Sequence, residues 1–123
     1  MSEIIKLEDF KKVDLVVGKI LSAEKIPETD KLLKLSVDLG DPTPRQIVSG
    51  IALYFGDCSV LVGKKCMFVA NLEPRVIRGI ESQGMICAVS TDPRSAEGSG
   101  EARDGLFSLL EPNDKIPAGT RAK

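Results

Sequence analysis

The sequence contains no histidine and no tryptophan among its 123 residues. Without histidine the chain cannot form Ser-His or Cys-His nucleophile pairs, imidazole general bases, or most zinc and iron sites. Carboxylates and lysines could still perform acid–base chemistry, but no convergent pair of acids stands out. We therefore expect a protein that is not an enzyme, with no metal site and no cofactor.

Aromatic residues and net positive charge are also scarce. The chain has one tyrosine and four phenylalanines, and its formal net charge is −1. Few aromatic rings argue against a groove that stacks successive bases of a single strand. A protein that wraps nucleic acid over its whole surface is usually far more basic. Any polyanionic partner must therefore be held by a local patch of cations.

Long apolar runs are absent as well. None approaches the ~18 residues of a membrane span, and the first ten residues, MSEIIKLEDF, mix acids with bases and lack the apolar core of a signal peptide. The three cysteines, Cys58, Cys66 and Cys87, are odd in number and show no paired spacing. These features predict a cytoplasmic protein with reduced, buried thiols and no membrane partner.

The apolar pattern is mostly that of short strands. LEDFKKV predicts one helical turn over Phe10, and a first strand begins near Val13. A shift of apolar phase at Gly18 predicts a β-bulge there. Strict alternation from Leu33 to Leu39 predicts a half-buried second strand.

The rest of the chain continues this pattern. We expect a third strand over 45–50, a short helix through IALYF capped by Ser49, a fourth strand over Lys65 to Ala70, a fifth over Gly84 to Ser90, a surface loop over 91–105, and a last strand in GLFSLLEP. The prediction is an all-β fold: a five-stranded Greek-key barrel of the oligonucleotide/oligosaccharide-binding (OB) type, with one short helix and a C-terminal β extension. It forms a single domain, 1–123, with the barrel over about 13–90 and the extension over about 91–123.

The connector between the fourth and fifth strands is longer than a hairpin needs. It places Arg75 and Arg78 three residues apart, with Pro74 and Gly79 to turn the chain. Lys64, Lys65, Arg75 and Arg78 outnumber Glu73 by three charges. Ser82, the Gly84 amide and Met85 could meet phosphate or base edges. The alternative is a plain surface loop whose arginines pair with Glu73 and Glu81.

Two other places carry weaker signals. Lys31, between the first two strands, borders the binding face of an OB fold, but it could equally be part of a solvated turn. Arg45 opens the third strand with Gln46, and the pair is either a phosphate and base contact or simply the exposed end of a strand.

Several short motifs resemble one family. VDLVVGKI, ETDKL, PRQIVSGIA, ANLEPR and GIESQGM follow in order from about Phe10 to the C-terminus. Together they resemble the tRNA-binding domain found at the C-terminus of methionyl-tRNA synthetases and in small free-standing tRNA-binding proteins. The resemblance implies an OB fold that engages structured tRNA, and in stand-alone members a homodimer built partly by the C-terminal extension.

The resemblance also implies site residues. The family's Asn-Leu-Pro-Arg connector falls on Asn71, Leu72, Pro74 and Arg75, its second basic residue on Arg78, and its Ser-x-Gly-Met motif on Ser82, Gly84 and Met85. Lys31 and Arg45 match its other basic positions. The chain departs from the family at Val16, where an arginine is common, and in its acidic balance and a longer insertion around 92–104.

We therefore expect a non-catalytic tRNA-binding module, either stand-alone or appended to a methionyl-tRNA synthetase. Its predicted RNA contacts are Lys31, Arg45, Asn71, Arg75, Arg78, Ser82, Gly84 and Met85, and its predicted partners are tRNA, an aminoacyl-tRNA synthetase or its complex, and a second copy of the chain. Two alternatives remain open: a peptide-binding, chaperone-like protein of the same fold, and an assembly or dimerisation domain of a synthetase complex.

Overall fold

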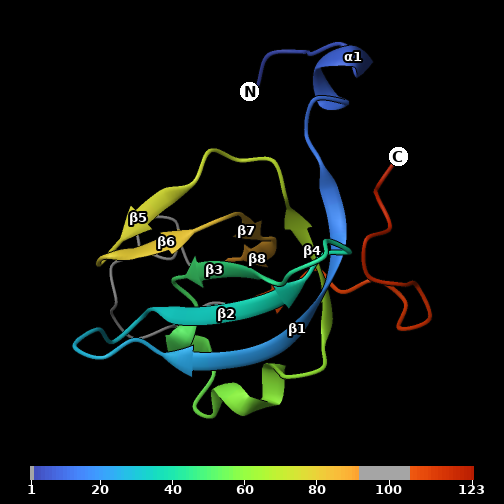
Figure 1. Ribbon diagram of the computed structural model, residues 1–123. Coiled ribbons are helices and arrows are strands. Elements are labelled where there is room, and N and C mark those ends of the chain that lie inside the picture. Colours follow the sequence, from blue (N-terminus) through green and yellow to red (C-terminus); the bar gives the residue numbers. More distant parts are fainter. Residues whose placement is uncertain (1, 92–105) are drawn as a thin grey trace.

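The computed structural model describes residues 2–91 and 106–123 (Figure 1). Five antiparallel strands form one sheet in the order β3-β2-β1-β4-β7, and the sheet curls into a nearly closed barrel. The predicted OB-type barrel is confirmed. The strands are β1 Leu15–Lys25, β2 Leu33–Asp38, β3 Arg45–Ser49, β4 Lys65–Val69, β5 Arg75–Ile77, β6 Ile80–Ser82, β7 Met85–Ile86, β8 Ala88–Ser90 and β9 Phe107–Leu109.

Three short helical segments accompany the strands in the part of the chain that the structure describes. The predicted N-terminal turn is α1, Leu7–Phe10, and two 3₁₀ turns, η1 Ala52–Tyr54 and η2 Cys58–Leu61, join β3 to β4. The predicted cap at Ser49 was wrong: Ser49 ends β3, and Ile51 stands before η1 with no side-chain cap. Most of the predicted loop, 92–105, and the insertion around 92–104 lie outside the described residues.

The first strand bends later than predicted. Its register shifts between Ile20 and Ser22, where β1 passes from β4 to β2 as its neighbour, and not at Gly18. Val16 and Ile20 both belong to the core, so Gly18 between them is an inward-facing position and no change of phase occurs there. Glycine is needed at this position because there is no room for a side chain: a Cβ atom at Gly18 would lie 2.6 Å from the Phe68 ring.

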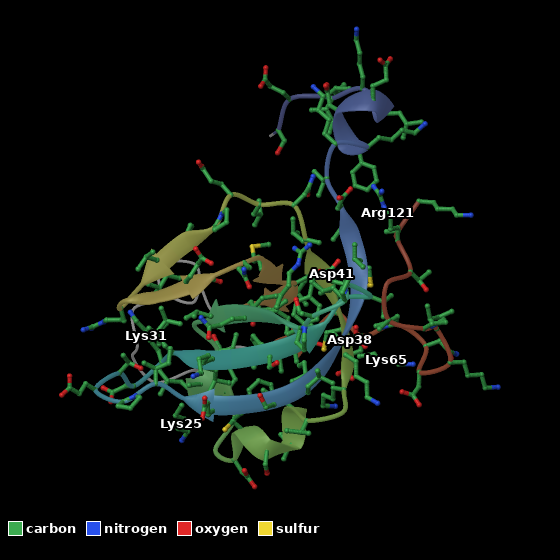
Figure 2. All side chains as sticks on the ribbon, viewed as in Figure 1. Lys25, Lys31, Asp38, Asp41, Lys65 and Arg121 are labelled. Carbon is green, nitrogen blue, oxygen red and sulfur yellow. The ribbon has the colours of Figure 1, made fainter. Side chains whose placement is uncertain are left out.

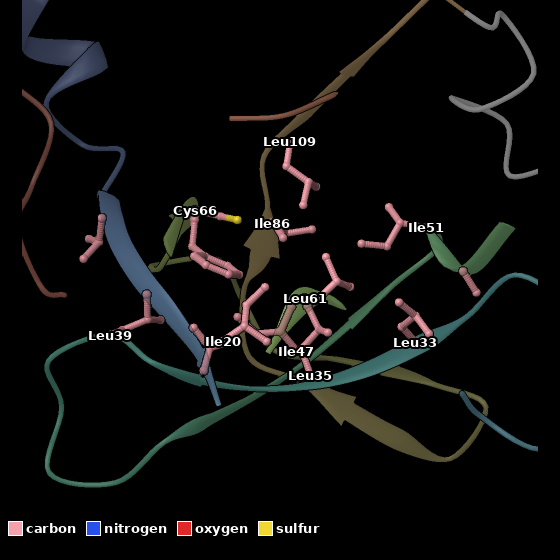
Figure 3. Packing of buried hydrophobic residues seen from close by; sticks show 14 residues of the cluster. Ile20, Leu33, Leu35, Leu39, Ile47, Ile51, Leu61, Cys66, Ile86 and Leu109 are labelled. Carbon is pink, nitrogen blue, oxygen red and sulfur yellow. The ribbon is translucent and has the colours of Figure 1, made fainter. Parts of the chain in front are cut away.

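The barrel interior holds one apolar cluster. The four alternating residues of the predicted second strand, Leu33, Leu35, Val37 and Leu39, are all buried, as expected. Figure 3 shows Leu35 meeting side chains from the neighbouring strands and from η2. The cluster consists of Val16, Ile20, Leu33, Leu35, Val37, Leu39, Ile47, Ile51, Ala52, Leu61, Cys66, Phe68, Ile86 and Leu109.

The predicted fifth strand is divided in two. β7 pairs with β4, whereas β8 pairs with β9 of the C-terminal extension. Cys87 lies between β7 and β8 and bonds to both partners. Its amide donates to Met67 O of β4 at 2.9 Å, and its carbonyl accepts from the Leu110 amide, next to β9, at 3.1 Å. The extension therefore continues the barrel wall.

The last residues also pair with the barrel. The Val17 amide donates to Thr120 O at 2.8 Å, and the amides of Gly119 and Ala122 donate back to β1 at 2.7 and 2.8 Å. Arg121 forms an ion pair with Asp14. These bonds cover an edge of β1 that β4 and β2 leave free. Within the described ranges, no helix is long and apolar enough to cross a bilayer.

Gly18→Ala should destabilise the fold by about 1–3 kcal/mol, because the new methyl group would overlap Phe68, Leu39 and Val37, all within 2.7 Å of its position. Urea denaturation followed by circular dichroism measures this. Gly56→Ala is the matched control, since nothing lies within 4 Å of its Cβ position. Equal free energies of unfolding for the two variants would contradict the packing explanation.

Candidate nucleic-acid interface

The connector that follows β4 folds into its own hairpin. β5 pairs with β6, and a two-residue turn, Arg78-Gly79, joins Ile77 to Ile80. Both turn residues have positive φ, 54° and 79°, which is the backbone of the type I′ turns that suit twisted hairpins. The sequence predicted a turn at Gly79 but an irregular connector; the structure instead carries Arg78 at the tip of a regular hairpin.

The end of this hairpin lies against the free edge of β3. The Val48 amide donates to the Ser82 hydroxyl at 3.0 Å, and the Gln46 amide donates to the Gln83 side-chain oxygen at 3.1 Å. In return the Gln83 amide donates to Gln46 O at 2.8 Å, and the Gln46 side chain donates to Glu81 O at 2.8 Å. Side chains thus take the place of a regular ladder where the barrel closes.

Ser82 and Gly84 therefore have structural roles. Ser82 is only 5% exposed, and its single hydroxyl hydrogen is donated to Gly84 O at 3.2 Å. Gly84 has φ of +150°, and a Cβ atom there would approach Val69 O to 3.0 Å. The Ser82 hydroxyl, predicted as an RNA contact, is buried and bonded to two protein groups.

Asn71 is likewise occupied by the protein. Its side-chain oxygen accepts from the Asp14 amide at 2.9 Å, and its side-chain nitrogen donates to Lys12 O at 2.6 Å. The asparagine ties the start of the connector to the segment that leads into β1. Asn71 therefore has a structural role in addition to the RNA contact predicted for it.

Arg45 also faces protein groups. Its Nε donates to the Asp41 carboxylate at 2.8 Å, and its Nη1 donates to the carbonyl oxygens of Ala70 and Gln83. The side chain is 30% exposed. This guanidinium, predicted as a phosphate contact, is engaged by three acceptors of the protein.

Four predicted contacts are accessible to solvent and are not held by ion pairs between described residues: Arg75, Arg78, Lys31 and Met85. Both arginines are exposed, Lys31 is half-buried and Met85 is 47% exposed. The ion pairs between described residues include none of the three cations, and the alternative in which the arginines pair with Glu73 and Glu81 is not observed. Met85 lines a hollow of about 90 Å³ beneath the hairpin, together with Leu72, Arg75 and Ile77.

The predicted cluster of four cations is divided between two places. Lys64 pairs with Glu111 at 3.3 Å, and the Lys65 ammonium donates to Asp114 O at 2.8 Å, so both hold the C-terminal extension. In Figure 2, Lys65 lies on the side of the C-terminal tail, and Lys31 on the opposite side. Lys64 and Lys65 precede the connector arginines closely in sequence, but β4 carries the chain to the other end of the barrel.

Comparison with known proteins decides the family. Residues 15–121 match the family model described as "Putative tRNA binding domain". The chain belongs to the tRNA-binding domain family. This confirms the family expected from the motifs.

Individual relatives agree with this result. The domain is 42% identical to a methionine–tRNA ligase of Porphyromonas gingivalis over 123 residues, which are all of this chain and 16% of that protein. It is 37% identical to the MetRS-related protein of Pyrococcus horikoshii, with a TM-score of 0.80, covering 99% of this chain and 100% of that one. The chaperone CsaA of Bacillus anthracis, at 24% identity and a TM-score of 0.77 over 98% of this chain and 100% of that one, shares the fold.

This tRNA-binding domain has an exposed cation beside the loop that carries Lys31, and sequence reasoning missed it. Lys25 ends β1, and it forms no ion pair with another described residue. Figure 2 shows Lys25 on the same side as Lys31, and in Figure 1 the loop that follows β1 projects on the same side as the β5–β6 hairpin. Its position at the end of a strand, next to a loop already singled out, could have identified it.

The cysteines form no second site. All three are free thiols, and Cys66 is fully buried as predicted, whereas Cys58 and Cys87 are half-buried. Burial raises the pKa of the Cys66 thiol to about 11, and burial also raises the pKa of Cys87. Within residues 2–91 and 106–123, no three acidic, cysteine or histidine side chains are grouped to hold a metal ion.

Ser82→Ala should lower the free energy of unfolding by about 1–3 kcal/mol, because the Val48 amide would lose its partner in a buried position. Ser22→Ala is the control, since Ser22 is exposed on β1. Chemical denaturation of the two variants beside the parent measures the difference. A Ser82→Ala protein as stable as Ser22→Ala would show that the edge of β3 does not depend on this hydroxyl.

Proposed function

We propose that this domain binds structured tRNA without catalysing a reaction, and that the tip of the β5–β6 hairpin is its principal phosphate contact. The observation that carries the proposal is the conformation of Arg78. It occupies the first position of a type I′ turn with φ of 54°, where asparagine, aspartate or glycine is usual. A left-handed backbone costs a residue such as arginine about 1–2 kcal/mol. No ion pair with a described residue offsets that cost.

The surrounding cations support the same surface. Arg75 is exposed on the hairpin, and Lys31 and Lys25 lie at the loop that projects on the same side of the barrel. With three or four phosphate contacts, the logarithm of the binding constant should fall with the logarithm of salt concentration at a slope of about −2 to −4. Met85 offers an apolar contact beside them.

In this mechanism the domain holds and orients tRNA. Cations neutralise phosphates and fix the orientation of the RNA, and shape and 2′-hydroxyl groups, more than groove sequence, distinguish the target. Acting in the cytoplasm beside, or joined to, an aminoacyl-tRNA synthetase, such a module raises the local tRNA concentration and leaves the chemistry to the synthetase. The methionine–tRNA ligases among its relatives support this partner.

Arg78→Asn tests the proposal sharply, because it should separate stability from binding. Asparagine accepts the left-handed backbone, so the free energy of unfolding should stay equal or rise. Filter binding at several salt concentrations should show weaker tRNA binding and a salt slope smaller in magnitude by about 1. Lys115→Ala, which removes an exposed charge from the C-terminal extension, should leave both unchanged.

Unchanged affinity and slope in Arg78→Asn would remove the hairpin tip from the binding site. Competition of labelled tRNA with single-stranded DNA and with an unfolded peptide distinguishes the alternative functions. Stronger binding of the peptide would replace the tRNA function with the chaperone-like one.

We also propose that two copies associate through the chain termini. Ile4, Ile5 and Leu7 are 99%, 60% and 66% exposed, and no residue of α1 is buried. Beside them lies a hollow of about 680 Å³, lined by Leu7, Phe10, Lys11, Val13 and residues 120–123. The exposed apolar residues form an arm that also carries Glu3 and Glu8, and these acids are complementary in charge to Lys11 and Lys123 at the edge of the hollow. The arm and the hollow belong to the same chain. Such self-complementarity is the requirement for a twofold dimer.

The double substitution Ile5→Asp and Leu7→Asp should convert a dimer into a monomer in sedimentation velocity, because it places two charges in the apolar contact. Val60→Asp, at a 55% exposed position on η2, is the control and should remain dimeric. A parent protein that sediments as a monomer at high concentration would rule out the arm-mediated dimer.

A further inference from the structure

Arg45 is connected to both ends of the segment that carries the hairpin. Its Nη1 donates to the carbonyl oxygen of Ala70, directly after β4, and to that of Gln83, directly after β6, the latter at 3.4 Å. Residues 71–82 lie between these two carbonyls. One guanidinium therefore joins the two points where the hairpin leaves and re-enters the barrel.

The orientation of this guanidinium is itself fixed. Asp41, in the turn before β3, accepts from Arg45 Nε at 2.8 Å. β3 holds the backbone of Arg45 through its pairing with Val37 of β2. Gln46, the next residue, donates its side-chain amide to Glu81 O at 2.8 Å and so holds β6 from the same strand.

We infer that Arg45 is a positioning residue for tRNA binding: it sets the direction of the β5–β6 hairpin without contacting RNA. The inference rests on the proposed function, in which Arg78 at the hairpin tip meets phosphate. A hairpin fixed at its base loses less conformational freedom when RNA binds, and preorganisation of this kind strengthens affinity. Because no phosphate is neutralised by Arg45 itself, its removal should not alter the number of counterions released.

Arg45→Lys distinguishes this role from a direct phosphate contact. Lysine keeps the positive charge and serves a phosphate as a point charge, but it lacks the planar fork that reaches Asp41 and the two carbonyls together. A clamp is therefore lost in both Arg45→Lys and Arg45→Ala, whereas a phosphate contact largely survives in Arg45→Lys.

The experiment combines two measurements on the parent, Arg45→Lys, Arg45→Ala and Arg78→Asn. Hydrogen exchange should show faster exchange of the amides in 75–82 in both Arg45 variants, with β1 and β2 protected as in the parent. tRNA binding over a range of salt should be about tenfold weaker in both, equivalent to about 1.4 kcal/mol, with the parent's salt slope. Arg78→Asn should show the opposite pattern, with a smaller slope and an unchanged hairpin.

Three results would overturn the inference. They are parent-like exchange of the hairpin in both Arg45 variants, parent-like binding by Arg45→Lys, and a slope reduced by about 1 in Arg45→Ala, which would make Arg45 a phosphate contact. If Arg45→Ala fails to fold, the lysine variant decides alone. If the parent does not bind tRNA, the proposed function fails while hydrogen exchange still decides whether Arg45 holds the hairpin.

Discussion

The backbone amides at the edge of β3 need hydrogen-bond partners where the barrel closes. The conformation of the segment at the end of β6 depends on supplying them. The amides of Gln46 and Val48 have no neighbouring ladder, and the side chains of Gln83 and Ser82 accept from them. An unpaired buried amide costs about 1–3 kcal/mol, so the sequence at this point is constrained by the fold. The close approach of Gly84 to β4 completes the same closure.

This closure joins the architecture to the proposed binding surface. The segment that supplies the acceptors for β3 is continuous with the hairpin that exposes Arg75 and Arg78. Polar residues near a binding surface can therefore belong to the support and not to the contact. The donors of Asn71, Ser82 and Arg45 end on carbonyl or carboxylate oxygens of the protein, so these three residues hold the segment together.

The sequence was most informative where a single face is buried. The alternation from Leu33 to Leu39 predicted β2 because only inward-facing positions have to be apolar. It misled at Gly18, since a glycine that makes room for Phe68 looks the same in sequence as one that bends a strand. The barrel type was predictable from the order of elements, but the strand break at Cys87 was not, because it depends on bonds to distant residues.

The candidate site was predictable in location but less so in its members. The sequence shows which residues are cations, but not whether an acceptor inside the protein binds them. Arg45 binds carbonyl oxygens 25 and 38 positions away, and Lys65 binds one 49 positions away. Arg78 was identified by its residue type, but its left-handed backbone was visible only in the structure.

The pairing of residues 119–122 with β1 has a consequence for the order in which the protein is made. The residues that bond to Leu15 and Val17 are synthesised about a hundred residues after β1. Until they emerge from the ribosome, part of β1 presents unpaired amides and carbonyls, which can pair with strands of other nascent chains. Synthesis of residues 119–122 thus ends a period in which the growing chain is open to aggregation.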